Sequence, residues 1–422
     1  MKRIGYWMIG LSLCGLSTFA AADEADRLAA LETRLNQLEQ RGGQGVPLYA
    51  SWQNGIRLNS ADNDIHIRIG GRVQGDFAGF DADSSLPDFD SGTTFRRTRL
   101  YVGGSLYDRT IFNVEYDFAG GDATLLTTFI GIRRIPFLGT IRVGRLLEFY
   151  SLEQLSSNNF HTFMERGLSA AFNQYWNNGI GIHNSVFDGR GTWAVGAAKS
   201  TNPYGRSDAD SQHTFSTRLT AAPIYQDDGR TWLHLGLSGI QRKPDGDEYR
   251  VRSRPESSVA PFLVDTDVLA ADRVNQVGLE LAATHGPVSV QAEWHQARVR
   301  LLATEDHDGQ TSSLSGFYVY VSWFLTGEHR PYNRQNGTFG RVTPRSSLGG
   351  DGHGWGAWEL AARYAELDLN DGPVKGGHLR NATLGLNWYL NPNVRLMGNL
   401  IRADLKEEGH AHIAQIRLAF DF

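Results

Sequence analysis

The sequence contains little cysteine and little lysine, and both shortages limit the sites that it can carry. Its single cysteine, Cys14, lies near the N-terminus, so disulfides and zinc–thiolate sites are excluded from the rest of the chain. Only five of the 41 basic residues are lysines. The other 36 are arginines, which stay ionised and present a planar fork of donors to oxyanions.

Long apolar runs are also missing after the first 22 residues. No later stretch offers the roughly 18 apolar residues that a membrane helix needs, so the chain is either soluble or a β-barrel. Proline is scarce, at 13 residues, whereas there are 48 glycines, 10 Trp, 15 Tyr and 21 Phe. This balance favours a large twisted antiparallel sheet, in which glycine eases bends and aromatics gather at membrane interfaces. A secreted β-sandwich or β-helix shares most of these biases.

Residues 1–22 are predicted to be a secretory signal peptide. Lys2 and Arg3 precede an apolar stretch, and the small residues before Asp23 place the cleavage after Ala22. The cysteine would leave with this segment.

Residues 23–41 are predicted to form a short periplasmic coiled coil that helps subunits associate. Four leucines follow one another at 3-4-3 spacing, which is the seam of such a coil: Leu28, Leu31, Leu35 and Leu38. A lone amphipathic helix is the alternative. Residues 42–64 are expected to be a linker that leads into the next domain.

The rest of the chain alternates apolar and polar residues with a period of two, which is typical of strands with one apolar and one wet face. The last segment, AHIAQIRLAFDF, puts Leu418 and Phe420 on one face and Gln415 and Arg417 on the other. A soluble sandwich also alternates, but here the polar face repeatedly carries charged residues in mid-strand. Segments of about ten residues predict an all-β transmembrane antiparallel barrel of about sixteen strands over residues 65–422. Its place would be the outer membrane of a Gram-negative-type bacterium.

One stretch, from Gly139 to Phe172, breaks this rhythm, because about twenty of its residues lack period-two order. A long loop early in a barrel can fold inward and narrow the lumen. Its charges would then act on permeating ions at short range and low effective dielectric. The pattern alone leaves open whether residues 147–164 fold inward or form an ordinary surface loop.

Four parts of the sequence resemble the phosphate-selective porins of the O and P type. They are FRRTRLYVGG, VGRLLEFYSLEQLSSNNFHTFMERGL, FLTGEHRPY with FGRVTP, and LGLNWYLNPNVRL. The resemblance runs from about Arg68 to Phe422. It implies a 16-stranded barrel, usually a homotrimer, with an inward-folded third loop and a ladder of arginines that guides anions to a constriction.

The resemblance also implies which residues line the anion pathway. They are arginines of the first two strands and residues that flank the constriction loop, with two acids that offset part of the positive charge: Arg68, Arg72, Arg97, Arg99, Arg142, Arg145, Arg166, Glu148 and Glu165. Strand parity turns the first four towards the lumen, where arginine avoids the cost of facing lipid. Arg96 has the opposite parity, so it belongs at the strand's end, above the lipid or past a bulge.

The match departs from the family at the constriction loop. Leu147 and Phe149 stand where family members typically have a lysine and a proline. Arginine can replace lysine as a phosphate ligand, because its fork binds two oxygens at once. Phosphate specificity therefore stays open.

We expect a porin for passive diffusion of small anions, with phosphate and polyphosphate as candidates. A general or oligosaccharide porin is the alternative, with an aromatic track of Tyr101, Phe149, Tyr150 and Phe160. A barrel enzyme or adhesin is a third class. No catalytic residue, metal, cofactor or nucleic acid is expected; His410 and His412 share a face but have no third ligand nearby. The expected partners are small anions, outer-membrane lipid and two further copies of the chain.

Overall fold

The computed structural model describes residues 29–30, 32–33, 46–207, 213–303, 309–349 and 354–422. The predicted signal peptide lies outside the described residues. Of the predicted coiled coil, only four residues are described, and these are helical.

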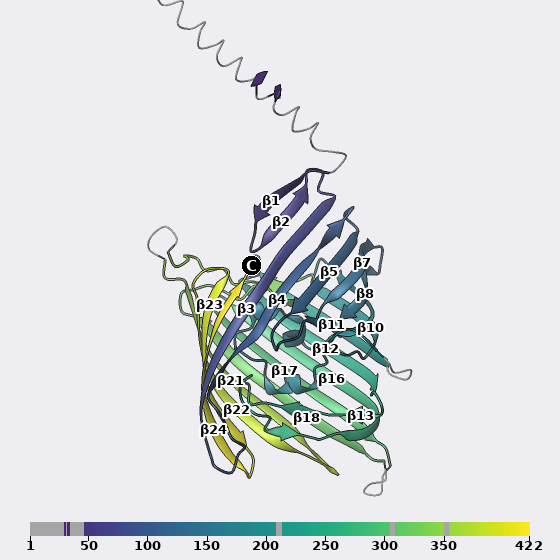
Figure 1. Cartoon of the computed structure of the whole chain (residues 1–422), viewed down its shortest axis with the longest axis vertical. Coiled ribbons are helices and arrows are strands. Elements are labelled where there is room, and N and C mark those ends of the chain that lie inside the picture. The colour runs from purple at the N-terminus through teal and green to yellow at the C-terminus, as the bar shows by residue number, and fades with distance from the viewer. Residues whose placement is uncertain (1–28, 31, 34–45, 208–212, 304–308, 350–353) are drawn as a thin grey trace, which may run out of the picture.

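Sixteen antiparallel strands form a closed barrel, as the sequence predicted (Figure 1). The last strand pairs with the first from Ala411 opposite Ala82 to Asp421 opposite Arg72, so the ring of sixteen strands is closed. The strands are β3 (Ile65–Ala82), β4 (Gly92–Leu106), β5 (Thr110–Asp117), β7 (Thr128–Ile135), β8 (Gly139–Leu146), β9 (Asn177–Val186), β10 (Gly191–Lys199), β11 (His213–Gln226), β12 (Thr231–Lys243), β16 (Leu269–His285), β17 (Val288–Leu301), β18 (Thr311–Phe324), β21 (Ala357–Asp371), β22 (Val374–Tyr389), β23 (Val394–Leu405) and β24 (Gly409–Asp421).

The remaining elements are short. A hairpin of β1 (Leu48–Trp52) and β2 (Ile56–Ser60), in the stretch expected to be a linker, pairs with the start of β3. The others are β6 (Thr124–Leu125), β13 (Glu248–Tyr249), β14 (Arg252–Ser253), β15 (Val264–Asp265), β19 (Tyr332–Asn333), β20 (Thr338–Phe339), α2 (Leu152–Leu155), η1 (Asn158–Phe160), η2 (Leu168–Phe172) and η3 (Asp227–Gly229). No helix in the described part of the chain is long and apolar enough to cross a membrane.

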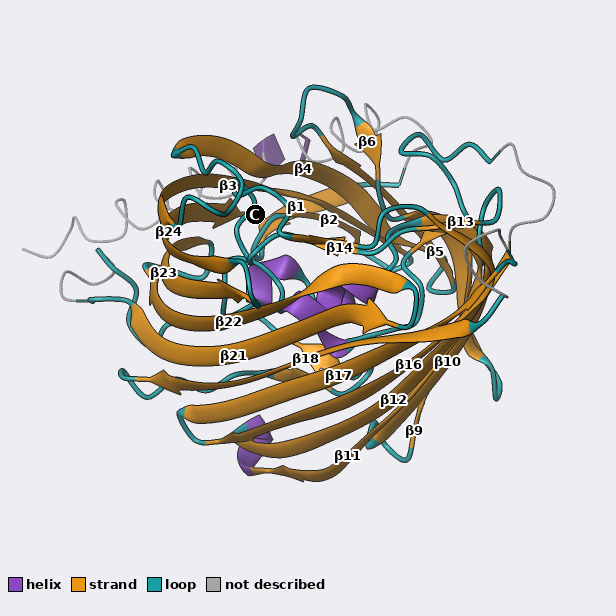
Figure 2. Cartoon of the chain, turned by 90° about the horizontal axis from the view of Figure 1, so that it is seen from below, coloured by secondary structure: helices purple, strands orange, loops and turns teal. Residues whose placement is uncertain are grey.

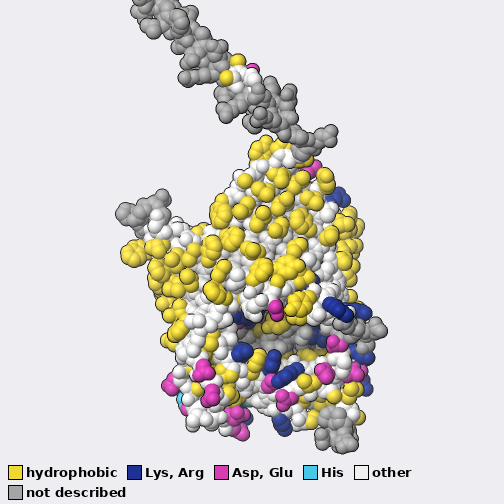
Figure 3. Space-filling view, in the orientation of Figure 1, with side chains coloured by type: hydrophobic (Ala, Val, Ile, Leu, Met, Phe, Trp, Pro, Cys, Tyr) yellow, Lys and Arg dark blue, Asp and Glu magenta, His cyan; other side chains and the backbone are white. Residues whose placement is uncertain are grey.

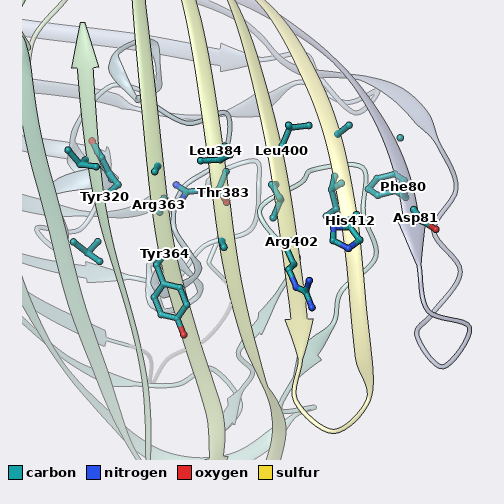
Figure 4. A pocket seen from close by; sticks show the side chains of 18 of the residues that line it. Phe80, Asp81, Tyr320, Arg363, Tyr364, Thr383, Leu384, Leu400, Arg402 and His412 are labelled. Atoms are coloured by element: carbon teal, nitrogen blue, oxygen red, sulfur yellow. The ribbon is translucent and has the colours of Figure 1, made fainter.

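Side-chain parity assigns the two faces of the wall. On β24, Leu418 is 56% exposed on the outside, whereas Gln415 and Arg417 on the inside are 3% and 1% exposed. The outer face is apolar over most of its height (Figure 3). Figure 4 shows a hollow on this face over β18, β21–β24 and β3, where Leu384 and Leu400 accompany the polar Arg402 and His412. The alternation therefore separates a lipid-facing surface from a polar interior.

The two ends of the barrel differ. The C-terminus and the β1–β2 hairpin lie at the end with most of the short connections, here called the turn end, at the top of Figure 1. The other end, the loop end, carries long connections, including residues 147–176 and 244–268. One long segment, residues 325–356, lies instead at the turn end between β18 and β21.

The wall is also uneven in height. Strands β5, β7 and β8 have eight residues each, whereas β3 has 18 and β22 has 16. Beyond the low wall, the space-filling view shows a recess that contains Lys and Arg side chains (Figure 3). This side of the barrel therefore exposes part of its charged interior.

Candidate functional site

Residues 147–176, here called the constriction segment, fold into the barrel (Figure 2) and include residues 147–164, whose infolding the family resemblance implies. Side chains on several wall strands hold the segment by hydrogen bonds to its backbone. The Glu293 carboxylate accepts from the N–H groups of Leu152 and Glu153, both at 2.8 Å. On the opposite wall, Arg96 of β4 forms an ion pair with Glu165 of the segment at 2.9 Å. The segment is thus fixed across the lumen at both sides.

Local sequence explains how the segment turns. The Ser151 hydroxyl accepts from the N–H of Gln154 and caps the single turn of α2, with Glu293 as a second acceptor at the same helix end. An acid at a helix N-terminus is also favoured by the exposed N–H groups there. The loss of period-two order therefore reflects short helical turns packed inside the barrel.

Two further segments also enter the lumen, and the period-two pattern did not predict their entry. From the loop end, residues 251–264 enter, and Glu256 pairs with Arg363 at 2.7 Å. From the turn end, residues 328–342 enter, and Trp232 of the wall donates to the carbonyl oxygen of Arg330 at 3.0 Å. Arg341 of this segment pairs with Asp421.

Two adjoining cavities of about 450 and 480 Å³ remain beside β3, β4 and β5. They share Arg96, Ala119, Arg166 and Tyr175, so they lie next to each other. Seven arginines line the two cavities, here called the arginine track: Arg72, Arg96, Arg97, Arg99, Arg166, Arg252 and Arg254. Four acids line them as well: Glu115, Asp117, Glu165 and Glu256. Positive charge therefore exceeds negative charge in both cavities.

A bulge in β4 brings Arg96 into the track. The register against β3 shifts between Arg97, which faces Gln74, and Phe95, which faces Gly75, so Arg96 is the extra residue. Its guanidinium forms a bidentate pair with Glu165 at 2.9 and 3.0 Å. Of the three placements expected from parity, the bulge is the observed one.

The carboxylate of Glu165 is saturated by arginines. It also accepts from Arg417 at 2.7 Å, and Arg417 pairs with Asp76 at 2.6 and 2.7 Å. Burial alone would raise the pKa of Glu165, but Arg96, Arg417 and Arg97 together hold it well below its ordinary range. Glu165 is thus a permanent anion that holds the constriction segment to the wall and is satisfied by arginine.

Several track arginines keep charge or donors free for a ligand. Arg166 donates to the carbonyl oxygen of Glu153 at 3.3 Å, and Arg252 and Arg254 stack on Phe262 at 4.1 and 4.2 Å. None of these three arginines has an ion pair within the described residues. The buried Nε atoms of Arg72 and Arg97 also lack a hydrogen-bond partner there, but they have almost no surface open to a solute. The charge of Arg166, Arg252 and Arg254 therefore makes this region attractive to anions.

The structure brings five of the nine predicted pathway residues to these cavities and leaves four elsewhere. Those at the cavities are Arg72, Arg97, Arg99, Arg166 and Glu165. Arg68 lies towards the turn end, where its Nε donates to the Tyr101 hydroxyl at 2.7 Å. Glu148 is buried against Arg242 at 2.8 Å and anchors the constriction segment.

The other two arginines, on β8, point in opposite directions. Arg142 faces inward over the ring of Phe129 at 5.0 Å but lines neither cavity. Arg145 shares the parity of the exposed Val143 and faces outward, where it donates to the carbonyl oxygen of Leu125 at 2.8 Å. Because it lies on the outer face, Arg145 does not contact the cavities, and its predicted place in the anion pathway is wrong.

Sequence reasoning missed Arg252 and Arg254. Their spacing of two in YRVRSRP was a signal, but it lies in a loop without period-two surroundings. None of the four candidates for the alternative, an aromatic track, lines the two cavities. Tyr150, for example, is buried and donates to the carbonyl oxygen of Val277 at 3.0 Å. The aromatic residues at the cavities are instead Phe95, Tyr175, Trp176 and Phe262.

Comparisons with known proteins agree with this architecture. Residues 67–422 match the family described as phosphate-selective porin O and P. Porin O of Pseudomonas aeruginosa is 23% identical over 85% of this chain and 87% of its own. An uncharacterised protein of Caulobacter vibrioides is 31% identical over 79% of this chain and 67% of its own. An anion-selective porin from Comamonas acidovorans shares the fold with a TM-score of 0.51 and 16% identity, over 84% of this chain and 99% of that one.

Proposed function

Because the chain belongs to the family of phosphate-selective porins O and P, an outer-membrane barrel family, we propose that it is a passive channel for anions. The observation that carries this proposal is the arginine track. Diffusion past these arginines needs no covalent step and no energy source, so the proposed role is passive transport. The loop end would face the outside and the turn end the periplasm, as in bacterial barrels with short periplasmic turns.

The distribution of charge supports anion preference. Glu165 and Glu256 are neutralised by close arginine pairs, and Asp117 is bound to Arg99 at 2.7 Å. Arg166, Arg252 and Arg254 keep their charge available. In a narrow space with low-dielectric walls, this excess attracts anions and repels cations more strongly than it would in bulk water.

Reversal potentials test the proposal. The purified protein in planar bilayers, under a chloride gradient, is expected to give a potential of the sign set by anion flow. A potential of the opposite sign, or closure to all ions, would exclude an anion channel.

Phosphate selectivity is a finer proposal that rests on the arginine forks. Arg97 and Arg99 offer planar donors that suit phosphate oxygens, but Leu147 lines the same cavity where the family usually has a lysine. Titration of phosphate into chloride solution is the test. A block of chloride current at low phosphate concentration supports a phosphate site, and current unaffected by phosphate leaves a general anion porin.

We also propose that the channel is a homotrimer. Eight tilted residues, as in β5, β7 and β8, fall short of the roughly 9–11 residues that a strand needs to span the membrane. A neighbouring subunit would cover this low wall and its charged recess. Mass measurement of the detergent-extracted protein tests this: a mass three times that of the mature chain is expected, and a monomer would contradict it.

A further inference from the structure

The cavity of about 450 Å³ combines arginines with apolar surface. Arg72, Arg97 and Arg99 come from the barrel wall, on β3 and β4. Four apolar residues from the constriction segment and the connection before β7 line the same cavity: Leu126, Leu147, Leu155 and Trp176. The segment also contributes polar residues: Gln154, Ser156, Ser157 and Asn158. A solute in this cavity therefore meets both charge and apolar surface.

The apolar residues are positioned by the fold and lie close to the arginines. Trp176 is fixed by a hydrogen bond from its Nε1 to the Thr127 hydroxyl at 2.7 Å, and its ring lies 5.4 Å from the guanidinium carbon of Arg99. Arg97 donates to the Gln74 side chain at 2.8 Å, and its ion pair with Glu165 is long, at 4.0 Å. The cavity thus places incompletely neutralised guanidinium charge close to apolar side chains.

We infer that the preferred solutes of this channel are organic anions that join a carboxylate to an apolar or aromatic group. The carboxylate would accept hydrogen bonds from the arginines, and the ring would lie against Leu147 and Trp176. This inference rests on the proposed function, since it names the class of anion that the same cavity selects. Covering about 60 Å² of apolar surface corresponds to about a tenfold gain in occupancy over an anion without that surface.

The test compares four solutes as blockers of chloride current through the wild-type protein in planar bilayers: benzoate, acetate, phosphate and benzyl alcohol. Benzoate is expected to reach half-block at a concentration about tenfold lower than acetate. Benzyl alcohol, which lacks the charge, is expected to have no effect. Equal half-block concentrations for benzoate and acetate, or tighter block by phosphate than by benzoate, would overturn the inference.

Variants at Leu147 separate the apolar surface from the charge. Leu147→Gln is expected to remove most of the difference between benzoate and acetate, whereas Leu147→Met keeps it and shows that the site tolerates substitution. Leu138→Gln, in the exposed turn between β7 and β8, is the matched control and should behave as wild type. A difference that survives Leu147→Gln would refute the role of this face. Wild-type cation preference would instead refute the proposed function, so the two failures are distinguishable.

Discussion

Arg166 is the residue at which the charge of the arginine track can be removed most cleanly. It lines both cavities and has a backbone carbonyl, not a carboxylate, as its hydrogen-bond partner. Its replacement therefore breaks no close ion pair, unlike replacement of Arg96 or Arg417. Arg166→Gln also preserves a donor for the Glu153 carbonyl.

The expected effect of Arg166→Gln on ion selectivity follows from Coulomb's law. A unit charge about 6 Å from a passing ion contributes about 0.7 kcal/mol in bulk water and about 3 kcal/mol at an effective dielectric constant of about 20. Screening at about 0.1 M salt reduces these values by about half, because the Debye length is about 10 Å. We take about 0.7 kcal/mol, which lies in the middle of the screened range. When Arg166 is replaced, the local anion concentration then falls about threefold and the cation concentration rises about threefold. The anion-to-cation permeability ratio should therefore drop by about tenfold.

Reversal potentials across a potassium chloride gradient measure this ratio for wild type and Arg166→Gln. The matched control is Arg300→Gln, since Arg300 lies on the outer face of β17, is 62% exposed and pairs with Asp272 at 3.7 Å. The control should keep the wild-type ratio. An unchanged ratio in Arg166→Gln, with normal conductance, would show that ions do not pass along the arginine track.

Three further outcomes follow from the same contacts. Leu147→Lys adds a cation to the 450 Å³ cavity, so phosphate should block chloride current at a several-fold lower concentration; unchanged block would show that this cavity is not the phosphate site. Arg417→Met leaves Asp76 and Glu165 without their shared cation, which should cost about 3–5 kcal/mol of stability and release the constriction segment. The variant is expected to give larger and noisier single-channel currents. A variant current as small and steady as that of the wild type would show that these ion pairs do not hold the segment. Burial raises the pKa of Glu153 to about 7, so its protonated form stabilises the seated segment fully below about pH 4.5, and this contribution is lost as pH rises through about 7. Current fluctuations should therefore increase between about pH 5 and 8 in wild type and stay constant in Glu153→Gln, and equal pH dependence in both would refute the assignment.

Much of the barrel was predictable because a strand's pleat makes side-chain direction a local property. Parity alone placed Leu418 outside and Arg417 inside, and the same rule turned Arg97 and Arg99 into the lumen. The same rule would have placed Arg145 on the outer face, because it shares parity with Val143. The family motif, which spans both strand and loop, favoured the lumen for that residue instead.

Other features of the site were beyond the reach of local patterns. The bulge that turns Arg96 inward depends on the register between β3 and β4. The entry of residues 251–264 and 328–342 into the lumen depends on ion pairs such as Glu256 with Arg363, which join residues about a hundred positions apart. Only the assembled fold shows such pairs.

The sequence by itself determined the barrel, its two faces and the presence of an arginine-rich interior, because period-two alternation and the cost of charge in lipid act on each strand separately. The tertiary structure decided which arginines share a cavity, which are neutralised, and that leucines and a tryptophan stand opposite them. These properties depend on how three long loops pack inside the barrel, and that packing is set by contacts between residues distant in sequence.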